Sequence, residues 1–286
     1  MALLIGCDFS SRPDHRKPIV IARGQLQGPS TVVLDALDTL HTPQAFARWL
    51  ASEPQWLGGF DFPFGLPREL VLAQGWPTAW AQTMRLYGSL SRAEIRDRFA
   101  AFCASRPIGG KFAHRATDRW AGSSPSMKWV NPPVAYMLHA GVPALMDAGV
   151  CLPGLHAGDP DQVDAQGRPC RVALEAYPGL LAREVLGRAS YKSDDPAKQT
   201  LQRRTCRQHL LDVLQKGQTR LGLRLSVTPG QQTLLLDDGR GDRLDAVLCL
   251  LQAAWGARHG WPDFGLPMPI DPLEGWIVTA VPTPCG

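Results

Sequence analysis

The sequence predicts an α/β fold with a mixed sheet whose first three strands are antiparallel and which helices flank. Three apolar runs rich in β-branched residues open the chain at residues 2–8, 18–24 and 31–37, and short polar or Gly/Pro turns join them. Helical and further strand-like runs follow. The 286 residues suffice for a sizeable core. Since we see no linker or repeat, we expect a single domain over residues 1–286.

The elements after the three strands are bounded by turn or cap residues. In order, we expect a helix at 43–52 with Pro43 in its first turn, a strand at 56–63 ended by Pro63, a helix at 91–105, a strand at 172–179 ended by Pro178, a long basic helix at 194–217, an amphipathic helix at 239–258 and a last strand at 274–280.

The stretch from about residue 67 to residue 149 is mostly helical and irregular, and it predicts a helical insertion in the domain. Within it, Ser91 and Glu94 have the spacing of a capping box and mark the start of the helix at 91–105. Residues 106–133 are rich in Gly, Ser and Pro and are expected to form a loop.

Composition is that of an ordinary globular protein. A net charge of +4 permits nucleic-acid binding without arguing for it. We find no apolar window of about 18 residues, and the apolar start is too short for a signal peptide, so we expect a soluble, cytoplasmic protein without a membrane segment. The seven cysteines lack a C-x-x-C pair and are expected to be reduced thiols, mostly in the core: Cys7, Cys103, Cys151, Cys170, Cys206, Cys249 and Cys285.

Five acids border or interrupt apolar elements. Asp8 and Asp61 end predicted strands, Glu175 lies near the end of a later one, and Asp242 and Asp245 share one face of the last helix. Burying a carboxylate is costly unless something compensates its charge. Each acid also has an ordinary alternative: a strand-end Asp as a turn former, Asp242 as a helix-dipole partner, and Glu175 as a partner of an arginine in the basic helix.

A divalent cation is an efficient compensator for such a group, and Mg²⁺ prefers oxygen ligands. Phosphodiester hydrolysis needs an activated water and a stabilised leaving alkoxide, and two ions about 3.5–4 Å apart provide both. Carboxylates converging from strand ends and one helix face therefore predict a site for Mg²⁺ or Mn²⁺, with two ions, that hydrolyses nucleic acid.

Four segments in this order carry a family resemblance: GCDFS at 6–10, FDFPFGLP at 60–67, LEAYPG at 174–179 and DRLDAVLCLLQAA at 242–254. The chain resembles a domain-of-unknown-function family of predicted RNase H-like nucleases, and the last segment is also similar to the final helix of RuvC-type junction resolvases.

The resemblance implies an RNase H-like sheet with metal ligands at Asp8, Asp61, Asp242 and Asp245, and it places Glu175 in a family motif. RuvC-type enzymes tend to have Glu where this chain has Asp61, and the shorter side chain is expected to shift or loosen the metal site.

Further polar and aromatic residues are secondary candidates. Lys192 and Lys198 bracket a polar loop after the LEAYPG segment and are expected to contact substrate phosphates. His114 is either a general acid–base or a surface histidine without a role. Trp120 and Trp129 either stack on bases or pack.

Two other functions compete with a nuclease. An actin-like phosphotransferase shares the core topology, but its phosphate loop usually needs D-x-G, and here Asp8 is followed by Phe9 and Ser10. A non-catalytic nucleic-acid-binding module is the other alternative, and the full set of acids disfavours it.

Overall fold

A computed structural model describes residues 3–280 and contains a six-stranded mixed sheet in the order β5-β4-β1-β2-β3-β6. Strands β1, β2 and β3 are antiparallel neighbours, which confirms the predicted meander, while β1, β4 and β5 are parallel, as are β3 and β6. The strands are β1 (Leu3–Asp8), β2 (Ile19–Gln27), β3 (Thr31–Leu40), β4 (Trp56–Phe60), β5 (Arg171–Glu175) and β6 (Arg224–Ser226).

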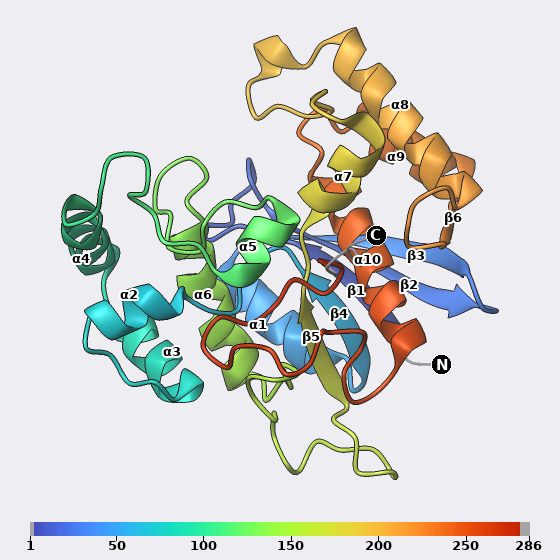
Figure 1. The fold of residues 1–286 in the computed structure, drawn as a ribbon. Helices are drawn as coiled ribbons and strands as arrows, with labels where there is room; N and C mark the ends of the chain where they lie inside the picture. The colour runs from blue at the N-terminus through green and yellow to red at the C-terminus, as the bar shows by residue number, and fades with distance from the viewer. Residues whose placement is uncertain (1–2, 281–286) are drawn as a thin grey trace, which may run out of the picture.

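Helices cover both faces of this sheet. Figure 1 shows α10 lying across the strands, with α8 and α9 on one side of the molecule and α2, α3 and α4 on the other. The helices are α1 (Pro43–Ser52), α2 (Arg68–Ala73), α3 (Trp80–Ser89), α4 (Arg92–Ala104), α5 (Ala116–Ala121), α6 (Val134–Asp147), α7 (Pro178–Leu186), α8 (Leu201–Lys216), α9 (Pro229–Asp237) and α10 (Asp242–His259), with a 3₁₀ turn at Pro196–Lys198.

The alternation of side chains along the strands divides the core in two. Ile5 and Cys7 of β1 belong to the cluster that includes α1 and the helices of the insertion. Leu4 belongs to the cluster on the opposite face, which includes α8 and α10. Successive strand residues point to opposite faces, so one strand supplies both cores.

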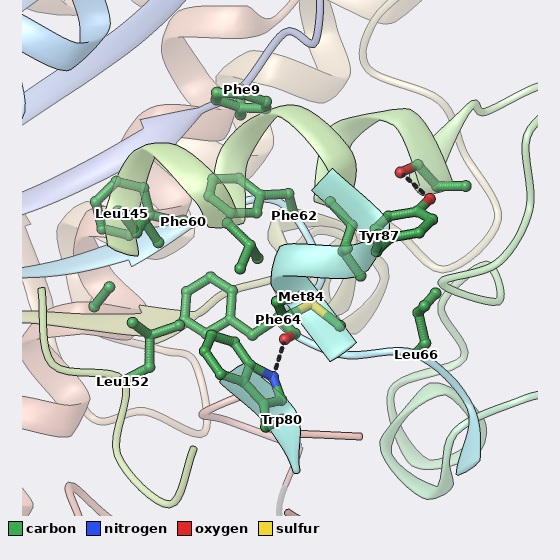
Figure 2. Packing of buried hydrophobic residues seen from close by; sticks show 14 of the residues in the cluster. Phe9, Phe60, Phe62, Phe64, Leu66, Trp80, Met84, Tyr87, Leu145 and Leu152 are labelled. Carbon is green, nitrogen blue, oxygen red and sulfur yellow. Dashed lines mark hydrogen bonds between the residues drawn. The ribbon is translucent and has the colours of Figure 1, made fainter. Parts of the chain in front are cut away.

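The insertion, α2 to α6, lies between β4 and β5, as expected for residues 67–149, and an aromatic cluster attaches it to the sheet. Figure 2 shows Phe9, Phe60, Phe62 and Phe64 packed toward α3 and α6, with the Trp80 indole donating to the Phe64 carbonyl at 2.8 Å. Buried aromatic residues with satisfied polar groups are strong packing anchors.

Several boundaries differ from the sequence prediction. Strand β4 ends at Phe60, before Pro63, and β5 ends at Glu175. Pro178 begins α7 instead of only ending a strand, which fits its fixed φ at the first helical position. The long basic helix begins at Leu201 because Thr200 caps it. Strand β6 and the helices α7 and α9 were not predicted.

Residues 274–280 do not form the predicted strand. Gly275 adopts φ +69, and beyond it the segment meets β5 only through the bridge between Glu175 and Ile277 before it turns. Helix α10 is not amphipathic: 13 of its 18 residues are buried, because it lies between the sheet and the helices α7 and α9.

Other expectations concern thiols and membranes. The six cysteines among residues 3–280 are free thiols, whereas Cys285 lies outside the described residues. Among the helices of residues 3–280, none has both the length and the apolar character needed to cross a bilayer.

Candidate metal centre

The two strand-end acids are placed side by side by the parallel pairing of β1 and β4. Cys7 pairs with Phe60, so Asp8 and Asp61 follow at the same end of adjacent strands. The Asp61 amide donates to the Cys7 carbonyl at 2.9 Å, which continues the ladder to the acid itself. Two carboxylates thereby meet at one edge of the sheet.

Two glycines bring the third acid to this edge. A Cβ at Gly6 would lie 2.0 Å from the carbonyl oxygen of Ala246, and one at Gly59 would lie 2.5 Å from that of Cys249. The α10 backbone therefore packs directly on β1 and β4, and Asp245 precedes Ala246 at this contact. Sequence reasoning missed both glycines, although a glycine inside a strand is a signal of close backbone approach.

Asp8, Asp61 and Asp245 each offer a carboxylate oxygen within 4.8 Å of the other two. Asp245 is fully buried, at 0% exposure, while Asp8 and Asp61 are partly buried. Hard divalent cations bind oxygens at about 2–2.6 Å, so a single ion can contact all three. The predicted convergence of these three acids is confirmed.

Burial and repulsion by neighbouring acids raise the pKa values of Asp8 and Asp61. Burial, followed by the charge of Asp245, raises the pKa of Asp8 well above its usual range. The same two causes, in that order, raise the pKa of Asp61 to about 7. The charged forms of Asp8 and Asp61 are therefore disfavoured in the absence of a cation, and a bound cation would stabilise them.

Lys192 and Tyr191 contact the deepest acid of the triad. The Lys192 ammonium and the Tyr191 hydroxyl each donate to one oxygen of Asp245. Burial is the largest single effect and acts to lower the pKa of Lys192, but the charges of Asp245, Tyr191 and Asp8 and the hydrogen bond to Asp245 together outweigh it, so the pKa is raised. Arg207, itself buried, donates to the Tyr191 carbonyl at 2.7 Å and fixes this segment. Tyr191 carries no motif and was not predicted, and Arg207, a basic residue of segment 183–220 whose charge is typical of a phosphate contact or a solvated helix face, instead supports the Tyr191 backbone.

The absence of a side chain at Gly241 leaves room for the Lys192 side chain beside the triad. Gly241 adopts φ +80 at the N-cap of α10, and a Cβ there would lie 2.8 Å from the Lys192 Cβ. A residue with φ in this region is ordinarily glycine. The close approach lets the start of α10 and the 191–192 segment share one site.

Asp242 stands beside the triad and is not one of its three members. It is the first residue of α10, and burial followed by the charge of Asp238 raises its pKa to about 6. Its own charge contributes to the raised pKa of Asp8, so the two acids are electrostatic neighbours. Of the four expected metal ligands, Asp8, Asp61 and Asp245 thus converge, whereas Asp242 lies next to them outside the group.

Glu175 is engaged by an arginine and not by the triad. Its Oε1 accepts from Arg115 at 2.6 Å, and its Oε2 accepts from Arg115 at 2.8 Å and from the Phe64 amide at 2.9 Å. Arg115, 2% exposed, also pairs with Asp118. The expected partner in the basic helix is wrong, because Arg115 is the N-cap residue of α5. The stretch 106–133 is thus not all loop, since it contains this helix. Glu175 is bound by Arg115 and is not one of the three converging acids.

The secondary candidates lie elsewhere. Lys198 is exposed and pairs with Asp195 at 3.5 Å, and the hollow that it lines is a different one. His114 is exposed. Trp120 is 53% exposed on α5, and Trp129 packs on Phe112 against the core.

The triad opens into a cleft of about 670 Å³, which is lined by four acids, Asp8, Asp61, Asp242 and Asp194, the last of which pairs with Lys17. We call it the basic cleft because five cations also line it: Arg12, Lys17, Arg92, Lys192 and Arg240. Such cations attract and position phosphates. They come from the β1–β2 loop, α4, and the segments around α10, so no single basic run in the sequence marks them.

Comparison of the chain with protein-family models, with curated proteins and with solved structures gave no match. The site is therefore interpreted from its own geometry and chemistry.

Proposed function

We propose that this protein is a metal-dependent nuclease with an RNase H-like core, which hydrolyses phosphodiester bonds of nucleic acid. One observation carries the proposal: Asp8, Asp61 and Asp245 converge within 4.8 Å at the edge of a cleft that five cations line. The sheet order, with β1 to β3 antiparallel and β1, β4 and β5 parallel, agrees with the core that the family resemblance implies.

The donor set fits Mg²⁺ or Mn²⁺. Three carboxylate oxygens are the ligands that these hard cations prefer, with substrate and water completing the shell. Asp8, Asp61 and Asp245 would hold one ion, and Asp242 is the acid available to hold a second together with Asp8. When bound, the ions would polarise the phosphate and lower the pKa of a bound water.

The chain's own residues would do the rest. Lys192, already at the triad, would donate to a non-bridging phosphate oxygen, because a cation held in position there stabilises charge that grows in the transition state. Arg12 and Arg240 on the cleft wall would hold neighbouring phosphates. Tyr191 would keep Asp245 oriented through its hydroxyl.

The phosphotransferase alternative is disfavoured by Phe9. Its ring is buried against Phe46 and Phe62, with centroids at 5.3 and 4.6 Å. The residue after Asp8 therefore serves the core, whereas a phosphate-cradling loop needs its backbone exposed to the nucleotide.

The test is cleavage by the full chain of labelled single-stranded and duplex DNA and RNA, hybrids and junctions, with Mg²⁺, Mn²⁺ or EDTA. We expect metal-dependent cleavage that Asp8→Asn reduces at least 100-fold, whereas Asp161→Asn, at an exposed site, retains it. Absence of cleavage of every substrate by the wild type, or full activity of Asp8→Asn, would contradict the proposal.

A further inference from the structure

A second hollow, of about 330 Å³, adjoins the metal centre. We call it the side pocket. It shares Asp61, Pro132, Met137 and Lys192 with the basic cleft, so these four residues stand between the hollows. Its other walls are largely apolar and include Phe62, Pro63, Val134, Ala176, Tyr177 and Ile277.

Charge distinguishes the side pocket from the basic cleft. Its arginine, Arg115, directs all its N–H groups to Glu175, Asp118 and the Glu274 carbonyl. A guanidinium saturated in this way offers nothing to an anion. Away from Asp61 and Lys192, which it shares with the basic cleft, the side pocket presents only the paired charges of Arg115 and Glu175. That part of the side pocket therefore suits an uncharged, largely apolar group, whereas phosphates suit the basic cleft.

The same helix that carries Asp245 fixes the pocket wall. Gln252, two turns further along α10 and fully buried, accepts from the Tyr177 amide and donates to the Tyr177 carbonyl, both at 2.8 Å. Arg183 lies over the Tyr177 ring at 5.1 Å and donates to its hydroxyl at 2.9 Å. The aromatic wall is thus preformed at a set position relative to the metal centre.

We propose that the side pocket receives one unstacked nucleobase of the substrate strand while the phosphate lies at the metal centre. This inference rests on the proposed function. A nucleobase is planar, uncharged and attached to phosphate through one sugar, which matches a small apolar hollow that shares a wall with the triad. A base inside a duplex must first be unpaired and unstacked before it can enter such a pocket, which costs a few kcal/mol. We therefore expect the protein to act faster on single-stranded, frayed or bulged nucleic acid than on perfect duplex.

The first test measures the contribution of the base to binding, without cleavage. In the Mn²⁺-loaded full chain, titration calorimetry compares adenosine 5′-monophosphate with ribose 5-phosphate. Stacking of a base on aromatic residues is worth about 1–3 kcal/mol, so we expect the nucleotide to bind at least about fivefold more tightly. Equal binding of the two ligands overturns the side-pocket assignment.

The second test fills the pocket. Val134→Trp places bulk at a half-buried position at the start of α6, and Val130→Trp is the matched control, since Val130 is 50% exposed and outside the pocket lining. We expect Val134→Trp to abolish the nucleotide preference and slow single-strand cleavage at least tenfold, with Mn²⁺ affinity within twofold of wild type. Val130→Trp should match wild type.

The outcomes separate the two proposals. If the wild type cleaves nucleic acid and Val134→Trp, with normal Mn²⁺ affinity, cleaves single strands equally well, the side-pocket assignment is wrong and the nuclease proposal stands. If the wild type prefers the nucleotide but cleaves no substrate, the nuclease proposal alone is wrong. A wild type that cuts perfect duplex faster than single strands also overturns the side-pocket inference.

Discussion

Replacement of Asp61 by Asn is expected to stabilise the metal-free protein while it weakens metal binding. Burial, followed by the charge of Asp245, raises the pKa of Asp61 to about 7. Relative to an ordinary value of about 3.9, this disfavours the charged form by about 4 kcal/mol at pH 8. Neighbouring acids share protons and charge, so only part of this cost belongs to Asp61 alone. We therefore expect Asp61→Asn to raise the free energy of unfolding by about 1–3 kcal/mol.

The pH dependence follows from the direction of this change. Between about pH 4 and pH 7 the folded protein holds a proton on Asp61 that the unfolded chain has lost. The wild type without metal should therefore lose stability as the pH rises through this window. Asp61→Asn should lose less, so the difference between the two proteins is small at pH 5 and largest near pH 8.

The assay is urea unfolding in EDTA at pH 5 and pH 8, repeated with Mn²⁺. Mn²⁺ at 100 times its dissociation constant should stabilise the wild type by about 2.7 kcal/mol and the variant much less. Asp161→Asn, at an exposed position, is the control and should change neither value. A variant less stable than wild type at pH 8 in EDTA would refute the electrostatic reasoning.

Three further substitutions test the construction of the site. Gly6→Ala should lower the free energy of unfolding in urea by about 3 kcal/mol and weaken Mn²⁺ binding, because the new methyl group meets the α10 backbone. The control Gly230→Ala, which has open space around it, should cost far less. Equal effects of the two substitutions would contradict the packing argument. Arg115→Met should lower the free energy of unfolding by about 3–5 kcal/mol, because it leaves Glu175 buried without its cation. Adding Glu175→Gln should recover part of this loss in a double-mutant cycle. Purely additive losses would count against the pair. Lys192→Met should tighten Mn²⁺ binding about tenfold in calorimetry, because the Lys192 ammonium competes with the ion for the Asp245 carboxylate. The same substitution should slow cleavage. Weaker Mn²⁺ binding by the variant would refute the competition.

Capping and turn residues in the sequence predicted where several helices begin. Pro43 lies in the first turn of α1, and Ser91 and Glu94 form the capping box of α4, as the sequence indicated. The antiparallel start of the sheet was also predictable, because short turns leave adjacent strands little choice but to pair. The burial of α10 was harder to predict. Its sequence pattern indicated one buried face, but the sheet and other helices cover most of its surface.

The sequence by itself determined which acids stand at the ends of apolar elements, and so it determined Asp8, Asp61 and Asp245 as candidates. Only the tertiary structure decided that these three meet, because their approach depends on Gly6 and Gly59, where the α10 backbone packs directly on β1 and β4. It also assigned Glu175 to Arg115, since a buried carboxylate pairs with whichever cation the fold brings to it, regardless of distance along the chain.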